Sequence, residues 1–503
     1  MLKPIKVVDL FAGPGGLGEG FSSVGADSSP TFKIVASIEK EESAHKTLTL
    51  RAFVREFPNR QPPLEYYQYL RKEIDKKTLI ETYPDKWCAA QKETFGSPLS
   101  LGEDNALIHN GISQALGDDK EPWVLIGGPP CQAYSLAGRA RNKSNVNYSA
   151  ESDHRNFLYQ EYLTIIAKYE PTVFVMENVK GILSSTPLGT PIFGKILDDL
   201  RQPKLGGLEY NIYSLSTLAD RADANGPIYN PKDFIIKSEE FGVPQCRHRV
   251  ILLGIRSDIP VNPNLLLLTK TDQVSVKSIL KNMPKLRSGL SKELDTASNW
   301  HKITNSALSN AHQYINGPRT QLKLGERPFS RGAPFIRAAR TLSNDIPKPL
   351  HDWLFDDQVE GVVQHESRSH MSADIERYSY VSLYGQIHDR SPRIKELPID
   401  LLPNHKNVDS GNFVDRFKVQ LASYPSKTIT SHIAKDSHAF IHYDPLQARG
   451  LTVREAARLQ TFPENYFFEG NRTQQYVQVG NAVPPFLANQ IGRIVAKVIP
   501  PRK

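Results

Sequence analysis

The sequence predicts an α/β protein: an open, mostly parallel sheet with helices on both faces, joined to a second, smaller domain of irregular structure. Short apolar runs rich in β-branched residues recur over the first 255 residues, separated by stretches long enough for helices. After residue 256 these strand signals thin out, and Pro, Ser, Asn, His and Arg become frequent. A chain of 503 residues is also too long for one small core.

Five runs are the expected strands: IKVVDLFA, FKIVASIE, WVLIGG, TVFVMENV and RVILLGI. Each is bounded by Gly, Pro or polar clusters, and continuous apolar runs of this length are typical of strands buried in a parallel sheet. The spacer NFLYQEYLTIIAKY predicts one of the crossover helices. We therefore interpret the five runs as buried strands of a parallel sheet.

The first domain is expected over residues 1–255, with an insertion at about 41–122 that contains the helical piece LEYYQYLRKEIDKKTLIETY. The second domain is expected over 256–469, and residues 470–503 return to the first. In LTVREAARLQTFPENY, Thr452 and Glu455 predict a capping box at the start of a helix that Pro463 ends. The segment VQVGNAVPPFLANQIGRIVAKVI predicts a strand, a Gly-rich turn and an amphipathic helix.

Composition narrows the class of protein. Three widely spaced cysteines form neither a disulfide framework nor a zinc pattern, which favours a reducing, cytoplasmic setting. There is no signal-peptide pattern and no apolar run of the ~20 residues that a membrane helix needs. The net charge of +8 is compatible with a polyanionic partner. We expect a monomer that contacts no membrane and binds no metal, since the histidine spacings match no ligand pattern.

A glycine loop follows the first predicted strand. In VVDLFAGPGGLGEGF, Gly13, Gly15 and Gly18 have G-x-G-x-x-G spacing, which lets backbone N–H groups approach a ligand at a helix start. Glu39 ends the next strand about 20 residues on, where an acid can bind ribose hydroxyls. These features predict a nucleotide-type site; the alternative is a tight turn beside a surface glutamate.

The glycine loop leaves the kind of nucleotide open. A dehydrogenase would bind a dinucleotide there, whereas a methyltransferase would bind S-adenosyl-L-methionine. Asp9 and Phe11 favour the second, because an acid can hold the ligand's ammonium group and an aromatic ring can pack on its adenine.

Cys131 stands at the end of IGGPPC, directly after a predicted strand. Ligands of open α/β sheets bind beyond the carboxyl ends of the strands, so the thiol should share an edge with the glycine loop. Pro129 and Pro130 stiffen the backbone before it, as a positioned nucleophile requires. Position alone leaves a nucleophile and an inert buried cysteine both open, and favours the inert one.

Glu177 ends the next strand, in VFVMENVKG, and QCRHR brings Gln245, Arg247 and Arg249 to the start of the last one. A carboxylate at this edge could hydrogen-bond a ligand or donate a proton, or it could cap the following turn. The two arginines lie on one side of an extended backbone and could hold a phosphate or a carbonyl oxygen, or lie on the surface.

Taken in order, DLFAGPGG, GGPPCQAYS, ENVKG, QCRHR, LTVREAARLQTFP and VGNAVPP resemble the motifs of the cytosine-5 DNA methyltransferase family. The resemblance covers both ends of the chain, and it leaves about 258–430 as the variable target-recognition region. It implies a Rossmann-like methyltransferase sheet. The family's aspartate that contacts the cofactor adenine has no clear counterpart, and Asp104 is the candidate.

The resemblance also implies roles. Cys131 would attack C6 of cytosine, Glu177 would contact N3 and the exocyclic amine, and Arg249 would hold the base or its phosphate, supported by Gln245 and Arg247. S-adenosyl-L-methionine would be surrounded by residues from both ends of the chain: Asp9, Phe11, Gly13, Gly15, Gly16, Glu39, Pro129, Asn481 and Val483.

Two basic stretches are candidates for contact with double-stranded DNA. The segment after the thiol carries Arg139, Arg141 and Lys143, and we expect it, from about Leu136, to be a mobile loop that closes on DNA. The recognition region offers candidates for phosphate or guanine contacts at Arg327, Arg331, Arg337 and Arg340.

The sequence therefore predicts an S-adenosylmethionine-dependent DNA cytosine-5 methyltransferase, in a restriction–modification or epigenetic context, that acts on a flipped-out base. An RNA cytosine-5 methyltransferase on the same scaffold is the main alternative. A non-catalytic DNA-binding relative and an unrelated dehydrogenase are the others.

Overall fold

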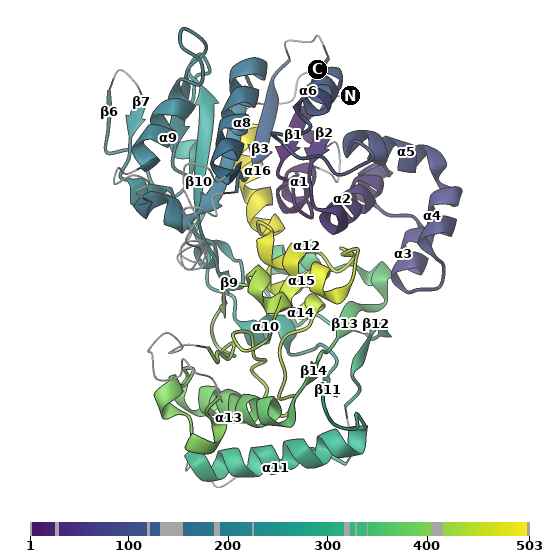
Figure 1. Ribbon diagram of the computed structural model, residues 1–503. Helices are drawn as coiled ribbons and strands as arrows, with labels where there is room; N and C mark the ends of the chain where they lie inside the picture. The colour runs from purple at the N-terminus through teal and green to yellow at the C-terminus, as the bar shows by residue number, and fades with distance from the viewer. Residues whose placement is uncertain are drawn as a thin grey trace.

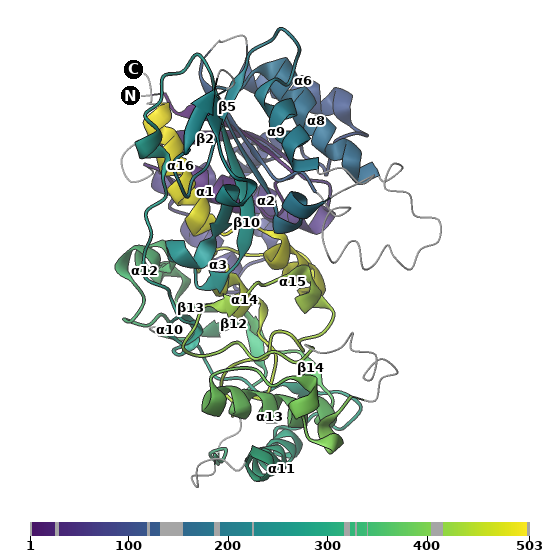
Figure 2. The same ribbon diagram turned by 90° about the vertical axis from the view of Figure 1, so that its left-hand side faces the viewer.

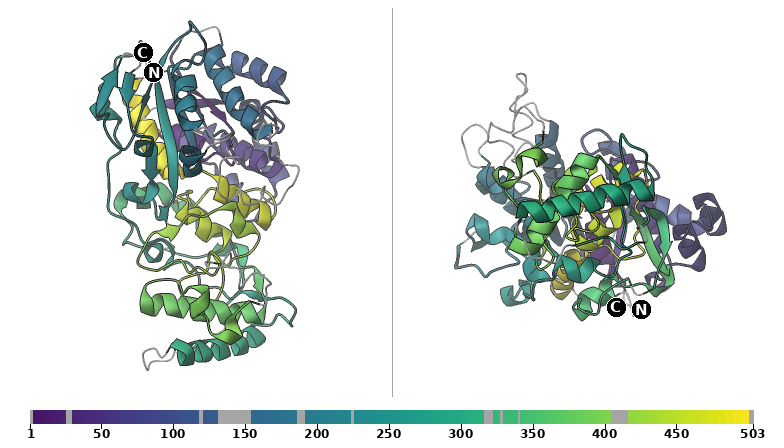
Figure 3. Two further views of the ribbon diagram at one scale, coloured as in Figure 1. Left: turned by 60° about the vertical axis from the view of Figure 1, so that its left-hand side comes forward. Right: turned by 90° about the horizontal axis from the view of Figure 1, so that it is seen from below.

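A sheet with its helices occupies one end of an elongated molecule, and two long helices, α11 (Ala297–Ile315) and α13 (Ser372–His388), lie at the other (Figure 1). Both chain termini lie at the sheet end, and Figure 3 gives two further views of this arrangement. The computed structural model describes residues 3–25, 30–117, 121–130, 154–185, 192–223, 226–315, 322–326, 329–339, 341–403 and 416–499.

The strands of the main sheet follow the order β2-β1-β3-β4-β10-β5, and β8 also pairs with β10. The strands β2, β1, β3 and β4 run parallel to their neighbours. Their bounds are β1 Ile5–Leu10, β2 Phe32–Ile38, β3 Trp123–Gly127, β4 Val173–Val179, β5 Tyr210–Tyr213, β8 Ile235–Lys237 and β10 His248–Arg256.

The interpretation of RVILLGI as a parallel strand is wrong, because β10 runs antiparallel to both β4 and β5. A parallel strand needs a long crossover, usually a helix, to bring the chain back to its starting edge. Within the described residues 214–223 and 226–247 the chain instead forms short strands and 3-10 turns: β6 Arg221–Asp223, β7 Gly226–Ile228, η4 Pro231–Phe234, η5 Ser238–Phe241 and β9 Gln245–Cys246. As a result β10 begins at the edge where β4 ends.

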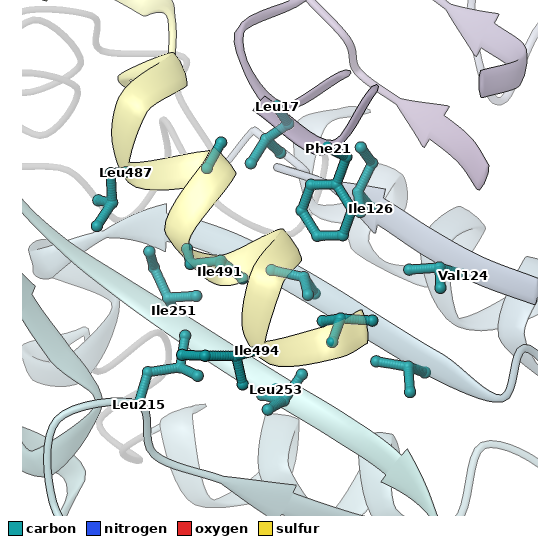
Figure 4. Packing of buried hydrophobic residues seen from close by; sticks show 14 of the residues in the cluster. Leu17, Phe21, Val124, Ile126, Leu215, Ile251, Leu253, Leu487, Ile491 and Ile494 are labelled. Carbon is teal, nitrogen blue, oxygen red and sulfur yellow. The ribbon is translucent and has the colours of Figure 1, made fainter. Parts of the chain in front are cut away.

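Helices cover both faces of the sheet, as predicted. One face packs against α6 (Asn105–Leu116), α8 (His154–Tyr169) and α9 (Ile192–Arg201). The other packs against α1 (Gly16–Ser22) and α16 (Pro485–Val498), whose apolar side chains meet those of β3 and β10 (Figure 4). The Rossmann-like fold predicted from the sequence is confirmed.

Near the end of the chain the predictions had mixed success. The helix α14 (Val453–Leu459) begins with the predicted capping box of Thr452 and Glu455. The strand predicted in VQVGN is wrong: this stretch ends the helix α15 (Arg472–Asn481), which has its own capping box of Asn471 and Gln474. The apolar run is short enough to fit either structure, and the upstream cap decides for the helix. The amphipathic helix predicted next is α16.

The stretch predicted as a helical insertion, at about 41–122, does form helices, and they project beside the sheet (Figure 1). It begins with the helix α2 and leads into α6. Its elements are α2 Glu42–Arg55, η1 Pro58–Arg60, α3 Leu64–Leu70, α4 Lys76–Thr82 and α5 Pro84–Glu93.

Past β10 the described structure is irregular. Two apolar cores lie beyond the sheet, one around α10, α12, α14 and α15 and the other around α11 and α13 (Figure 2). The remaining elements are η2 Lys180–Ser184, η6 Pro263–Leu266, α10 Val276–Leu280, β11 Gly289–Leu290, β12 Gly332–Arg337, α12 Lys348–Leu354, η7 Asp357–Val359, β13 Gly361–Glu366, β14 Ser369–His370, η8 Ile394–Glu396, η9 Ile399–Leu401, β15 Ser426–Lys427 and η10 Ser431–Ala434.

Candidate active site

Glu177 and Arg249 form an ion pair at the edge where the parallel strands end. The Nε atom of Arg249 lies 2.8 Å from Oε1 of Glu177, and the two side chains keep 16% and 13% of their surface exposed. The antiparallel direction of β10 makes this possible, since it pairs Arg249 with Val179 at the end of β4. A parallel strand would have placed this arginine at the opposite edge of the sheet.

The segment that leads to the predicted nucleophile lies beside this pair. A Cβ atom added at Gly128 would stand 3.0 Å from Oε2 of Glu177, so a side chain there would crowd the carboxylate. Asn178 donates a hydrogen bond from Nδ2 to the carbonyl oxygen of Pro129 at 3.1 Å. No role was predicted for Asn178 from the sequence. The one feature that could have indicated a role is its position next to Glu177, the acid near the end of the strand. Residues that lie outside the described part of the chain are Cys131, Arg139, Arg141 and Lys143, with the predicted mobile loop.

Arg247 and Gln245 are buried behind the ion pair. Arg247 donates from Nη1 to the carbonyl oxygens of Ile429 at 3.0 Å and Gly480 at 3.2 Å, and from Nη2 to that of Asn481 at 3.4 Å. Burial lowers the pKa of Arg247 well below its usual range. Gln245 accepts a hydrogen bond from the backbone of Ile429 at 2.8 Å. Both residues tie the chain around β9 and the start of β10 to the backbone at residue 429, and Arg247 also ties it to the backbone at 480–481.

Glu39 joins the glycine loop to the end of β2. Its Oε2 accepts a hydrogen bond from the backbone N–H of Gly13 at 2.8 Å, and its Oε1 accepts one from that of Glu41 at 2.7 Å. Burial raises the pKa of Glu39. A carboxylate has about four acceptor positions, so two further donors can still reach it.

Phe11 and Gly13 form the open part of the loop. Phe11 has a φ of 55°, uncommon for a residue other than glycine, and such backbone strain is frequent at functional sites. Gly13 has a φ of 58°, and among the described residues, its two chain neighbours aside, no atom lies within 4 Å of the position that a Cβ would take. Both residues are half-buried, so this part of the loop can still receive a ligand.

The buried part of the loop contacts the end of the chain. A Cβ atom at Gly16 would lie 2.3 Å from the carbonyl oxygen of Val483, so only glycine permits this approach. Gly15, with a φ of 96°, lies against the hydroxyl of Tyr466. Val483 itself is buried, whereas Asn481, two residues before it, is exposed.

Asp9 lies beneath the loop rather than in the open. The side chain is fully buried, and neither carboxylate oxygen has a hydrogen-bond partner among the described residues. Burial raises the pKa of Asp9 to about 8; the charge of Arg55 opposes this shift and that of Glu93 adds to it.

Asp104 begins α6 close to the Glu39 backbone. The carboxylate of Asp104 accepts a hydrogen bond from the N–H of Ser100 at 2.8 Å, and the N–H of Leu99 donates to the carbonyl oxygen of Glu39 at 3.0 Å. The segment 99–104 therefore lies beside the candidate nucleotide site, with the Asp104 carboxylate engaged in its own turn.

Of the four arginines predicted to contact DNA from residues 327–340, the two that the structure describes are both ion-paired. Arg331, directly before β12, lies 2.9 Å from Asp295, and Arg337, at the end of β12, lies 2.6 Å from Glu360. The side chain of Arg337 is 66% exposed, and exposed pairs of this kind exchange partners at little cost. Arg327 and Arg340 lie outside the described residues.

The described residues contain neither a membrane-spanning helix nor a metal-binding cluster. Their helices include none long and apolar enough to cross a membrane. Their His, Cys, Asp and Glu side chains include no group of three or more that could hold a metal ion.

The sheet order, the glycine loop and the polar side chains at the ends of the strands fit the Rossmann-like class of methyltransferases. The sequence model for "C-5 cytosine-specific DNA methylase" matches residues 66–497. The chain belongs to this family, and the resemblance and the enzyme class predicted from the sequence are confirmed.

Curated relatives agree with the family. The type II methyltransferase M.Bpa9945I of Bacillus paralicheniformis is 33% identical, over 98% of this chain and 99% of its own. The type II methyltransferase M.AgeI of Thalassovita gelatinovora is 26% identical over 98% and 99%. The DNA (cytosine-5-)-methyltransferase M.ApeKI of Aeropyrum pernix is 25% identical, over 75% of this chain and 81% of its own.

Proposed function

We propose that the chain transfers a methyl group from S-adenosyl-L-methionine to C5 of cytosine in a short, specific sequence of double-stranded DNA. The observation that carries this proposal is the Glu177–Arg249 pair beside the segment that leads to Cys131. The similar proteins M.Bpa9945I and M.AgeI are type II methyltransferases, which supports a role of this chain in restriction–modification. A cytoplasmic monomer acting on the host's own DNA would meet this role.

The residue types at the edge match the chemistry. C5 of cytosine is a poor nucleophile, and addition of the Cys131 thiolate to C6 would make C5 carbanion-like. Glu177 would hydrogen-bond N3 and the exocyclic amine and stabilise the adduct, while Arg249 would hold the base. Neither face of a stacked base can be reached, so the cytosine has to be flipped out of the duplex. C5 would then attack the methyl group on the sulfonium sulfur, whose bond to that methyl group breaks to leave a neutral thioether. A base would later remove the C5 proton, and the Cys131 thiolate would leave C6 as the C5–C6 double bond forms again.

Gln245 and Arg247 act in this proposal as positioning residues. Their contacts with backbone groups at 429 and at 480–481 fix the start of β10, and with it the place of Arg249. The same contacts hold Asn481 at the edge of the site.

The residues around the glycine loop fit S-adenosyl-L-methionine, which supplies an electrophilic methyl group on a sulfonium centre. Phe11 and Gly13 would receive the nucleoside, and the free acceptor positions of Glu39 would bind the ribose hydroxyls. We propose that the open residues contact the ligand and that the buried ones shape the loop and pocket from behind: Asp9, Gly15, Gly16, Pro129 and Val483.

DNA would be held by basic residues on both sides of the site. Arg139, Arg141 and Lys143 would close over the target base, and the arginines of the recognition region would contact phosphates or guanines: Arg327, Arg331, Arg337 and Arg340.

The test is methyl transfer from labelled S-adenosyl-L-methionine to unmethylated duplex DNA and, in parallel, to tRNA. We expect transfer to the duplex, with bisulfite sequencing showing 5-methylcytosine at one short sequence. Transfer to tRNA in place of DNA would identify the RNA alternative, and no transfer to either would refute the proposal.

A further inference from the structure

In the recognition region, β12 pairs with β13 in a two-stranded antiparallel sheet, the β12–β13 hairpin, whose strands are joined by residues 338–360. Among the described residues, β12 pairs with no strand other than β13, and hairpins of two strands are marginally stable on their own. Arg331 precedes β12 and Arg337 ends it. Whatever fixes β13 therefore also fixes these candidate DNA contacts.

Asp356 connects the chain just before β13 to the helical insertion. Its Oδ2 accepts hydrogen bonds from the hydroxyl of Tyr67 in α3 at 2.9 Å and from Nδ2 of Asn465 at 2.5 Å. Its Oδ1 accepts one from the N–H of Gln358 at 3.0 Å. This bond caps the start of the turn η7, which leads into β13. One carboxylate thus joins α3 to the chain that enters β13.

Asn465 extends this connection to the sheet end of the molecule. Its Oδ1 accepts a hydrogen bond from Nη1 of Arg51 in α2 at 3.0 Å. Its carbonyl oxygen accepts one from the hydroxyl of Tyr66 at 2.7 Å. A continuous series of hydrogen bonds runs from α2 through Asn465 and Asp356 to the hairpin.

Arg71 forms a second connection from the end of α3. The side chain, 7% exposed, donates from Nη1 to the carbonyl oxygen of Gln358 at 3.0 Å and from Nε to Glu73 at 2.9 Å. Glu73 in turn lies 3.7 Å from Arg337. The insertion therefore reaches β13 through η7 and the far end of β12 through a charge pair.

Apolar packing surrounds these polar contacts. Tyr66, Tyr67 and Leu70 of α3 share one buried cluster with Val359 and Val363, and each is at most 5% exposed. Close-packed contacts of this kind have few alternative arrangements, so they fix the relative position of the two surfaces.

We propose that the helical insertion is a brace that positions the β12–β13 hairpin for DNA binding. This inference rests on the proposed function, since it takes the hairpin to contact DNA. Tyr67 and Arg71 are then positioning residues: they touch neither the reacting groups nor the candidate nucleotide site. Loss of the brace should weaken DNA binding and spare the chemical step.

The test compares the double variant Tyr67→Phe/Arg71→Met with the parent and with Tyr83→Phe. Tyr83 is a matched control, because its hydroxyl bonds to Glu65 at 2.7 Å within the insertion itself. We measure kcat and KM on unmethylated duplex DNA and S-adenosyl-L-methionine binding by calorimetry. We expect KM for DNA to rise about tenfold in the double variant, as the loss of two hydrogen bonds would allow, with kcat and cofactor binding unchanged.

Hydrogen exchange adds a readout that needs no activity. The brace predicts faster exchange of the backbone amides of 361–366 in the double variant and unchanged exchange in Tyr83→Phe. If the double variant does not fold, Tyr67→Phe alone is measured, with a smaller expected rise in KM.

The brace is refuted if the variants match the control, or if kcat and cofactor binding fall together with DNA affinity. A parent enzyme that methylates no DNA would instead refute the proposed function, and the exchange of 361–366 would still decide whether the insertion holds the hairpin.

Discussion

Among the arginine–carboxylate pairs of this molecule, those at the sheet edge and those around α14 stand in contrasting surroundings. At the sheet edge, Arg249 and Glu177 are partly exposed and stand beside the backbone that leads to Cys131. Around α14, Arg458 contacts Glu464 through two hydrogen bonds of 2.8 Å, with the arginine side chain fully buried. Arg449 and Glu455 form a similar buried pair at 2.7 and 2.8 Å.

The difference shows that surroundings decide what a charge pair does. Arg458 also donates to the carbonyl oxygens of Ile279 at 3.3 Å and Thr341 at 2.9 Å, so its donors are used to join separate segments. Such an arginine is an architectural element, because removing one partner leaves the other charge buried. In the proposed function, the edge pair would exchange its contacts for those of a base. The buried set was not predicted from the sequence; the available signal was two arginines one helical turn apart, Arg454 and Arg458, in the helix that the capping box begins.

The largest expected effect is at the edge site. Replacing Cys131 by alanine should lower the methyl-transfer rate about a thousandfold or more, because the step that activates C5 is lost. The rate is measured with labelled cofactor on duplex DNA, with cofactor binding as a check on folding. Cys88→Ala is the matched control, since this exposed thiol lies in α5, and it should match the parent. Full activity of Cys131→Ala would refute the mechanism.

The next largest effect is expected in the buried set, which comprises the pairs Arg458–Glu464 and Arg449–Glu455. Arg458→Met should lower the free energy of unfolding by about 3–5 kcal/mol, because Glu464 would be left as an uncompensated buried charge. Urea denaturation checks this value. Arg256→Met is a suitable control, since its pair with Asp258 is more exposed and should contribute about 1 kcal/mol or less. An equal loss in the two variants would remove the contrast between the two regions.

The effect of Glu177→Gln should fall on catalysis rather than stability. We expect kcat to fall about a hundredfold, in the range for a positioned acid–base group, with cofactor affinity and unfolding free energy close to those of the parent. Single-turnover methylation and urea denaturation measure the two quantities. If Glu177→Gln destabilised the fold as much as Arg458→Met, the edge pair would belong with the architectural ones.

The smallest effect is a pH dependence of the free energy of unfolding that comes from two buried histidines, His365 and His442. Burial lowers the pKa of His365 and that of His442 to about 4, from an ordinary 6.5. Both stay neutral in the folded protein while the unfolded chain takes up protons. Stability is therefore fully present above pH 6.5 and falls as the pH drops towards 4, by about 1.4 kcal/mol per pH unit for each histidine.

Urea denaturation between pH 5 and pH 7.5 measures this slope. In His365→Gln the slope should shrink by the share of one histidine. A slope unchanged by this substitution would show that His365 does not supply it.

The sequence by itself determined the strands of the sheet, the glycine loop and the helical character of the stretch that follows the second strand. Buried strands and Gly-rich turns leave local signals, and Glu39 and Glu177 could be assigned to strand ends from periodicity alone. The family followed from six ordered motifs, each local. The helix at 472–481 was missed because its cap lies upstream of the apolar run that suggested a strand.

Only the tertiary structure decided the direction of β10, the burial of Asp9 and the attachment of the insertion to the recognition hairpin. Each depends on contacts between residues far apart in the chain, such as Arg249 with Glu177 or Tyr67 with Asp356. A local pattern shows that a strand or helix forms, but its direction and its partners are set by how the whole chain satisfies its buried polar groups and packs its apolar ones.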